Sequence, residues 1–277
     1  MANSECACQC LLYISVSIFR WPEGAGEAAG LYEGPCYSSR WQRGLHGGRS
    51  YHYTGDVDPL QQLCGEIVRC RQCPRLVQWR ERVASEKRAA FREWEYWGRP
   101  LPGFGDPSAE LVVVGLAPAA HGGNRTGRVF TGDRAGDWLY RALHRAGYAN
   151  QPNSDHRDDG LRLTRAYVTA AVRCAPPGNK PTTEERDTCL PYLERELELL
   201  KDVRVIVPLG GFAYGVVSRI TGLRPAPRFG HGVEACLSDG RTVLCSYHPS
   251  QQNTFTGRLT EGMLDAIFRR ARELSPA

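Results

Sequence analysis

The chain lacks any long apolar stretch. No run approaches the roughly 20 residues that a membrane-spanning helix needs, and the nearest candidate, Leu11 to Phe19, has no positively charged region before it that would mark a signal peptide. Lysine is scarce as well, with 3 among 35 basic residues, and the net charge of +5 is modest. We therefore expect a soluble cytoplasmic protein without membrane contacts, whose charge allows a polyanionic partner but does not require one.

Periodic structure is absent from the N-terminal part. Residues 1–55 show neither helical nor alternating periodicity, so we expect a poorly ordered appendage, followed by one domain over 56–277. In that domain four β-rich runs, "ELVVVG", "AYVTAAV", "VRVIVPLG" and "TVLCSY", alternate with helical segments. The alternation predicts an α/β fold whose four-stranded, mainly parallel sheet is covered by helices on both faces. The expected helices span 59–69, 78–95, 134–146, 183–200, 212–221 and 259–274.

Four of the 11 cysteines form two pairs. Cys70 and Cys73 are separated by two residues, and Cys174 and Cys189 by fourteen. Four thiolates suit either tetrahedral zinc or a 4Fe–4S cluster, and the spacing does not choose between these two. Buried cysteines that bind nothing are the third reading.

Polar or glycine-rich turns follow the predicted strands, at the sheet edge where ligands bind in such folds. The turn at 115–133, "GLAPAAHGGNRTGRVFTGD", comes directly after the first strand. Asn179 lies in a proline- and glycine-rich loop, where its amide either reads the edge of a uracil-like base or simply forms the turn. His248 stands at the end of the last strand, as a proton donor, an anion stabiliser or a packed histidine.

These segments together resemble one family. The turn at 115–133, "CAPPGNKPTTEERDTC", the upstream "CRQC" and "HPSQQNTFTGRL" are similar to the family 5, or type b, uracil-DNA glycosylases, in the same order over roughly residues 58–274. The resemblance implies a three-layer α/β/α sandwich and a 4Fe–4S cluster on Cys70, Cys73, Cys174 and Cys189. It also implies excision of uracil and related deaminated bases from DNA, the first step of base excision repair.

The resemblance further implies roles for single residues. Phe130 would stack on a base extruded from the duplex, beside a pocket lined by the backbone of Gly115, Ala117 and Ala119. Asn179 would pair with the pyrimidine edge. The segment from Gln251 to Phe255 would enter the minor groove, although its wedge residue is not identified by the pattern. The residues expected to contact DNA are Arg125, Lys180, Gln252, Asn253 and Arg258.

Cleavage of the C–N bond requires one group that stabilises the cationic sugar and another that stabilises the departing anionic base. His248 fits the second role. The early turn positions 116–120 hold only Leu, Ala and Pro, so no carboxylate is available there. The resemblance makes Asp133, at the end of the same turn, the candidate for the carboxylate that positions the attacking water, although it also precedes a helix whose N-terminus it would cap. Lys180 is the only lysine near the motifs, and we expect it to contact phosphate, which predicts a monofunctional enzyme that uses water.

Another class of protein remains open. A non-catalytic α/β module that binds nucleotides or damaged DNA, with a structural metal site, would also have a glycine-rich turn after a strand. The absence of a G-x-G-x-x-G sequence weakens this alternative. The expected partner under the glycosylase reading is single- or double-stranded DNA containing uracil or other deaminated bases, bound by a monomer associated with the nucleoid.

Overall fold

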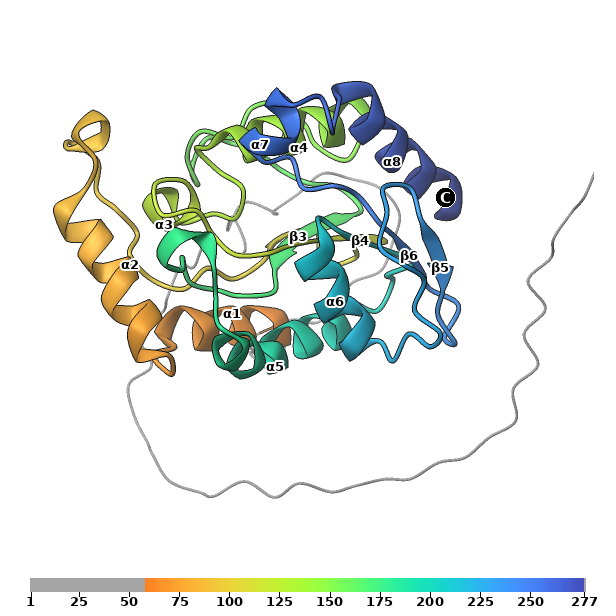
Figure 1. The fold of residues 1–277 in the computed structure, drawn as a ribbon, viewed down its shortest axis with the longest axis horizontal. Helices are drawn as coiled ribbons and strands as arrows, with labels where there is room; N and C mark the ends of the chain where they lie inside the picture. The colour runs from red at the N-terminus through yellow and green to blue at the C-terminus, as the bar shows by residue number, and fades with distance from the viewer. Residues whose placement is uncertain (1–57, 277) are drawn as a thin grey trace, which may run out of the picture. The chain divides into compact units, whose positions relative to one another are not determined.

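The computed structural model describes residues 58–276, so the expected appendage over 1–55 lies outside the described part. The described residues form a three-layer α/β fold, as expected (Figure 1). The strands are β1 (Phe104–Gly105), β2 (Leu111–Gly115), β3 (Ala166–Ala170), β4 (Val205–Pro208), β5 (Glu234–Cys236) and β6 (Thr242–Leu244). The helices are α1 (Pro59–Arg69), α2 (Pro74–Glu86), α3 (Gly123–Thr126), α4 (Arg134–Arg145), α5 (Thr183–Leu199), α6 (Gly211–Ile220), α7 (Gln251–Phe255) and α8 (Glu261–Leu274). Among these helices none is long and apolar enough to cross a bilayer.

The sheet has the strand order β1-β3-β2-β4-β6-β5. Its four central strands are the four expected ones, and they are mutually parallel. Two further strands at the edges, β1 and β5, are antiparallel to their neighbours. These edge strands have two and three residues, which is too short to show a periodic pattern in the sequence.

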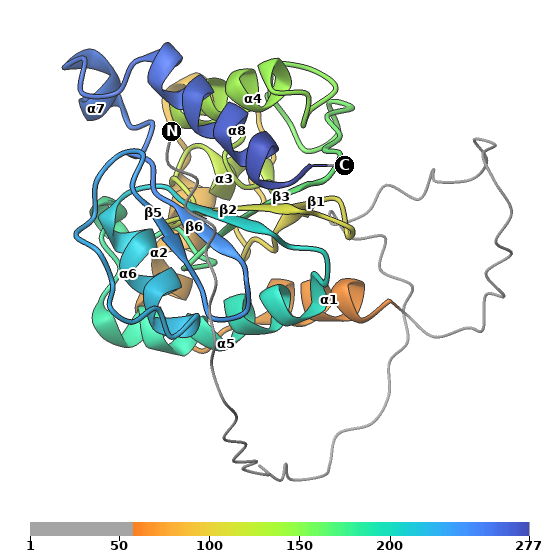
Figure 2. The ribbon, with the colours of Figure 1, turned by 90° about the vertical axis from the view of Figure 1, so that its right-hand side faces the viewer.

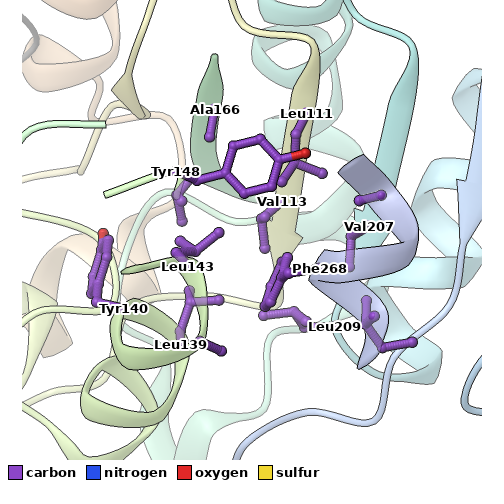
Figure 3. Packing of buried hydrophobic residues seen from close by; sticks show 14 of the residues in the cluster. Leu111, Val113, Leu139, Tyr140, Leu143, Tyr148, Ala166, Val207, Leu209 and Phe268 are labelled. Carbon is purple, nitrogen blue, oxygen red and sulfur yellow. The ribbon is translucent and has the colours of Figure 1, made fainter. Parts of the chain in front are cut away.

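Helices cover both faces of the sheet. Figure 2 shows α4 and α8 on one side and α1, α5 and α6 on the other. In β2, Leu111 and Val113 pack against Leu139 and Phe268 of the first layer (Figure 3), whereas Val112 and Val114 belong to the core on the opposite face. Because both faces are covered, every residue of β2 is buried, and its sequence is a continuous apolar run.

The helix expected over 78–95 is wrong at both ends. The observed α2 starts at Pro74, which is well suited to the first turn of a helix, and ends at Glu86. Lys87 then adopts φ +56° and turns the chain away. Past this point Phe91 and Trp94 each place a ring 4.0 Å from the guanidinium carbon of Arg125, so tertiary contacts replace the last helical turns.

Candidate active site

The 115–133 turn leaves the sheet at the carboxyl end of β2, the strand between β3 and β4. The first residues of the turn are hydrogen-bonded to the residues that follow β3. The N–H groups of Ala171 and Val172 donate to the carbonyls of Gly115 and Leu116 at 2.9 and 3.0 Å. The turn and the loop that carries Cys174 therefore leave the sheet together.

Phe130 joins the turn to the end of β6. Its ring lies directly over Gly115, where a Cβ atom would be only 2.6 Å from two ring carbons, so glycine is required there. The ring centroid of Phe130 is 5.8 Å from that of His248, with the planes tilted by 34°. Phe130 itself has φ +51°, an uncommon conformation for a residue with a side chain. Two segments distant in the sequence, the 115–133 turn and the end of β6, thus meet at this ring.

Asp133 is the N-cap of α4, as the sequence predicts. One carboxylate oxygen accepts the Gly136 N–H at 2.9 Å. The other faces back into the turn, where a Cβ atom on Gly122 would lie 2.1 Å from it. Burial raises the pKa of the Asp133 carboxyl, although the Gly136 hydrogen bond opposes this shift. A carboxylate that is costly to ionise is a stronger base than an exposed one.

His248 follows β6 and contacts Phe130 on its way into α7. Burial lowers the pKa of His248 to about 4, so its imidazole is neutral at pH 7. The Asn253 side chain donates to the His248 carbonyl at 2.9 Å and so fixes the loop between β6 and α7. On the other side the Tyr247 N–H donates to Nδ1 of His231 at 3.2 Å. Sequence reasoning missed His231, which lies in an irregular loop with no pattern to reveal it.

The pocket-lining alanines have different neighbours. The Ala119 carbonyl accepts the N–H groups of Gly122 and Asn124, at 3.2 and 3.1 Å, and so closes the first part of the turn. Ala117 packs against the apolar cluster that contains Cys174 and Cys189. The turn therefore contacts the apolar cluster to which two of the four cysteines belong.

Asn179 and Lys180 are exposed on the loop after β3. Asn179 ends a 3-10 turn, Pro177–Asn179, with φ +56°, and its side chain makes no hydrogen bond within residues 58–276. The Lys180 carbonyl accepts a hydrogen bond from Arg75 at 3.2 Å. Both side chains are thus available to a ligand, and their roles stay predictions.

The residues expected to contact DNA divide into two groups. Gln252 and Arg258 are exposed, and the Arg258 guanidinium carbon lies 4.7 Å from the centre of the Tyr247 ring. Arg125, in contrast, is only 4% exposed and donates to the carbonyls of His121 and Gly132 at 2.8 and 2.9 Å. Its placement argues against the expected DNA contact, because the guanidinium holds the turn together from inside.

The four cysteines come from three segments of the chain. Cys70 follows α1 and Cys73 precedes α2, while Cys174 lies beyond β3 and Cys189 within α5. Burial and the neighbouring thiols raise the pKa of Cys73 to about 11, and burial raises that of Cys174 to about 12. No group of three or more His, Cys, Asp or Glu side chains within residues 58–276 is arranged to hold a metal ion. The expected cluster therefore stays a prediction.

Comparison with known proteins identifies the family of this chain. The family model of the uracil DNA glycosylase superfamily matches residues 102–272. The chain belongs to this superfamily, and within it to the type-5 enzymes. A type-5 uracil-DNA glycosylase of Mycobacterium bovis is 57% identical over 225 residues, which cover 80% of this chain and 84% of that protein. The type-5 enzyme of Thermus thermophilus is 53% identical over 76% of this chain and 95% of its own length, and that of Pyrobaculum aerophilum 48% over 74% and 88%.

Proposed function

We propose that this protein hydrolyses the N-glycosidic bond of uracil and related deaminated bases in DNA and so initiates base excision repair. Membership of the superfamily supports a DNA glycosylase that acts on uracil. The observation that carries the proposal is the ring contact between Phe130 and His248 at the carboxyl ends of the parallel strands, with Asp133 capping α4 three residues after Phe130. These three side chains provide an aromatic surface for a base, a carboxylate and a neutral imidazole.

Each of these groups has a distinct task in the proposed reaction. A base extruded from the duplex stacks on Phe130. His248 is neutral, so it stabilises the departing uracil anion by donating a hydrogen bond rather than by carrying charge. Asp133 stabilises the positive sugar or takes a proton from the attacking water. The sequence has no lysine in the 115–133 turn or in the segment after β6, which supports a water-dependent, monofunctional reaction without a Schiff base.

The pocket wall determines how selective the enzyme is. Residues 116–120 are Leu, Ala, Pro, Ala and Ala, which offer no hydrogen bond from a side chain to a base. We expect a roomy pocket that accepts hypoxanthine beside uracil. Discrimination then depends on stacking against Phe130 and on Asn179, whose exposed amide can pair with a base edge.

We assign the wedge of the DNA-binding surface to Phe255. It is 67% exposed and is the only large hydrophobic side chain so exposed within residues 58–276. It ends α7, seven residues after His248, and the guanidinium carbon of Arg134 lies 4.4 Å from the centre of its ring. An apolar ring that enters the duplex beside a cation would prop the DNA open while the cation contacts phosphate. Lys180, Gln252 and Arg258 complete the proposed surface, and Asn253 supports it through the His248 carbonyl.

A 4Fe–4S cluster on Cys70, Cys73, Cys174 and Cys189 fits the chemistry of the site. The four thiols influence one another electrostatically, and three of them share one buried apolar cluster. A 4Fe–4S cluster is held by four cysteine thiolates, which these four residues would supply. When bound, the cluster would tie α1, α2 and α5 to the loop after β3. We propose a structural role for it.

The decisive experiment uses a duplex with a single uracil. The purified protein should release uracil and leave an abasic site that alkali cleaves, and a matched duplex with thymine should remain intact. A protein that binds the uracil duplex but leaves no abasic site would instead support the alternative of a non-catalytic damage-binding module. Action by a monomer on DNA in the cytoplasm stays part of the proposal, and sedimentation with and without DNA tests the monomer.

A further inference from the structure

Arg80 is buried in the middle of α2, with 2% of its surface exposed. One terminal nitrogen donates to the sulfur of Cys174 at 2.8 Å, and the other donates to the carbonyl of Cys70 at 3.1 Å. Its third nitrogen, Nε, is buried without a hydrogen-bond partner in the described part of the chain. The Arg80 side chain therefore lies against two of the four cysteines.

This guanidinium has no adequate counter-ion among residues 58–276. Its one ion pair is with Glu81 at 3.9 Å, and that carboxylate is 44% exposed and already hydrogen-bonded by Arg71. Arg173 is equally buried, but both oxygens of Glu196 pair with it, at 2.7 and 3.0 Å. A guanidinium is always charged, and a buried charge without a partner is strongly destabilising. The group that faces Arg80 must therefore carry negative charge.

The backbone of Arg80 contacts the 115–133 turn. The side-chain amide of Asn124 donates to the Arg80 carbonyl at 3.2 Å, and Asn124 is fully buried. The backbone N–H of Asn124 donates in turn to the Ala119 carbonyl, which closes the part of the turn nearest the base pocket. One residue thus contacts the cysteines with its side chain and the turn with its carbonyl.

We propose that Arg80 is a positioning residue: it is the counter-ion of the metal centre held by the four cysteines, and it couples occupancy of that centre to the order of the 115–133 turn. The inference rests on the cluster proposed above. Metal-bound thiolates supply the negative charge that Arg80 lacks, so the centre holds α2 in place. Without the metal the thiols are neutral, so the buried cation is left uncompensated, α2 shifts, and the support for Asn124 weakens.

The charge of Arg80 would also affect a cluster held by the four cysteines. Reduction of such a cluster at an electrode would add negative charge beside the guanidinium, which would favour the reduced form. Arg80→Met should therefore lower the midpoint potential, whereas Arg80→Lys should stay close to the parent. Outer-shell partners of a metal site typically contribute 10- to 100-fold to affinity. We expect Arg80→Met to lose iron to a chelator more readily by about that factor.

The control is Arg82→Met, the same substitution on the same helix at an exposed position, where the guanidinium lies over Trp79. Iron content, midpoint potential and hydrogen exchange over 119–124 are measured for the parent and all three variants. A second test needs no variant: chelation of iron from the parent should accelerate exchange over 119–124 more than over 261–274 in α8. This test stands even if Arg80→Met fails to fold.

Two results would overturn the inference. One is a parent protein that holds no iron after anaerobic purification. The other is an Arg80→Met protein with the potential, iron retention and exchange of the Arg82→Met control. Uracil release is assayed separately on the parent, so normal excision with an unaltered potential in Arg80→Met would refute the coupling and leave the proposed function intact.

Discussion

Asp133 both caps α4 and faces the turn, and a set of three substitutions separates these roles. Asp133→Ala removes the acceptor for the Gly136 N–H, and loss of an N-cap costs about 0.5–2 kcal/mol. For a domain of this size, each kcal/mol lowers Tm by about 2–4 °C. Asp133→Ser and Asp133→Asn keep an oxygen that accepts this hydrogen bond, so their melting temperatures should lie near that of the parent.

In catalysis, by contrast, the three variants should behave alike. None of them carries a carboxylate, so all three should lose about 10²- to 10⁴-fold in the single-turnover rate of uracil release. That loss corresponds to about 3–5 kcal/mol of transition-state stabilisation. Because burial raises the pKa of Asp133, the parent rate should fall on acidification at a higher pH than an exposed aspartate would cause, and the variants should lack this inflection. An Asp133→Ser protein with the parent rate would show that Asp133 is only a helix cap.

Four further outcomes follow from the site. Gly115→Ala places a methyl group 2.6 Å from the Phe130 ring, so uracil release should fall sharply. Adding Phe130→Leu to Gly115→Ala should restore part of the lost release. His248 stays neutral to about pH 4, whereas in the unfolded chain it takes a proton near pH 6.5. The free energy of unfolding should therefore fall as the pH drops from about 6.5 to about 4, and denaturant titrations of His248→Gln should show a shallower fall. Phe255→Ala should weaken excision from duplex DNA far more than from single strands, in parallel assays of both substrates. Borohydride should trap no adduct between Lys180 and abasic DNA, as mass spectrometry can verify.

The fold was largely predictable because its central strands are buried on both faces. A strand such as β2 then reads as an unbroken apolar run, and the helices between such strands are long enough to show their own period. The short edge strands β1 and β5 leave no such trace. The start of α2 was missed because Cys73 and Pro74 look like a turn, and its end because Arg125 draws Phe91 and Trp94 out of the helical path.

The site was predictable where residues are adjacent in a motif and less so where the fold brings distant ones together. Of the expected residues, Phe130 and His248 are in ring contact and Asp133 caps α4, while their roles in the reaction stay predictions. The opposite holds for Arg125, whose sequence context resembles that of a DNA contact but whose guanidinium is buried. Nothing in a sequence indicates which way an arginine points, since its long side chain suits both surfaces and interiors. For the same reason the sequence does not indicate that Arg80 of α2 lies against Cys174.

The central claim is that this chain removes uracil from DNA with Asp133 and His248, and one measurement tests it most directly. Single-turnover release of uracil from a duplex is compared for the parent, Asp133→Ser and His248→Gln, with binding of the same duplex measured in parallel. We expect abasic product from the parent, at least about 10²-fold slower release by each variant, and unchanged duplex binding by all three. A parent protein that binds the duplex without releasing uracil, or variants that release it at the parent rate, would rule out these roles for Asp133 and His248.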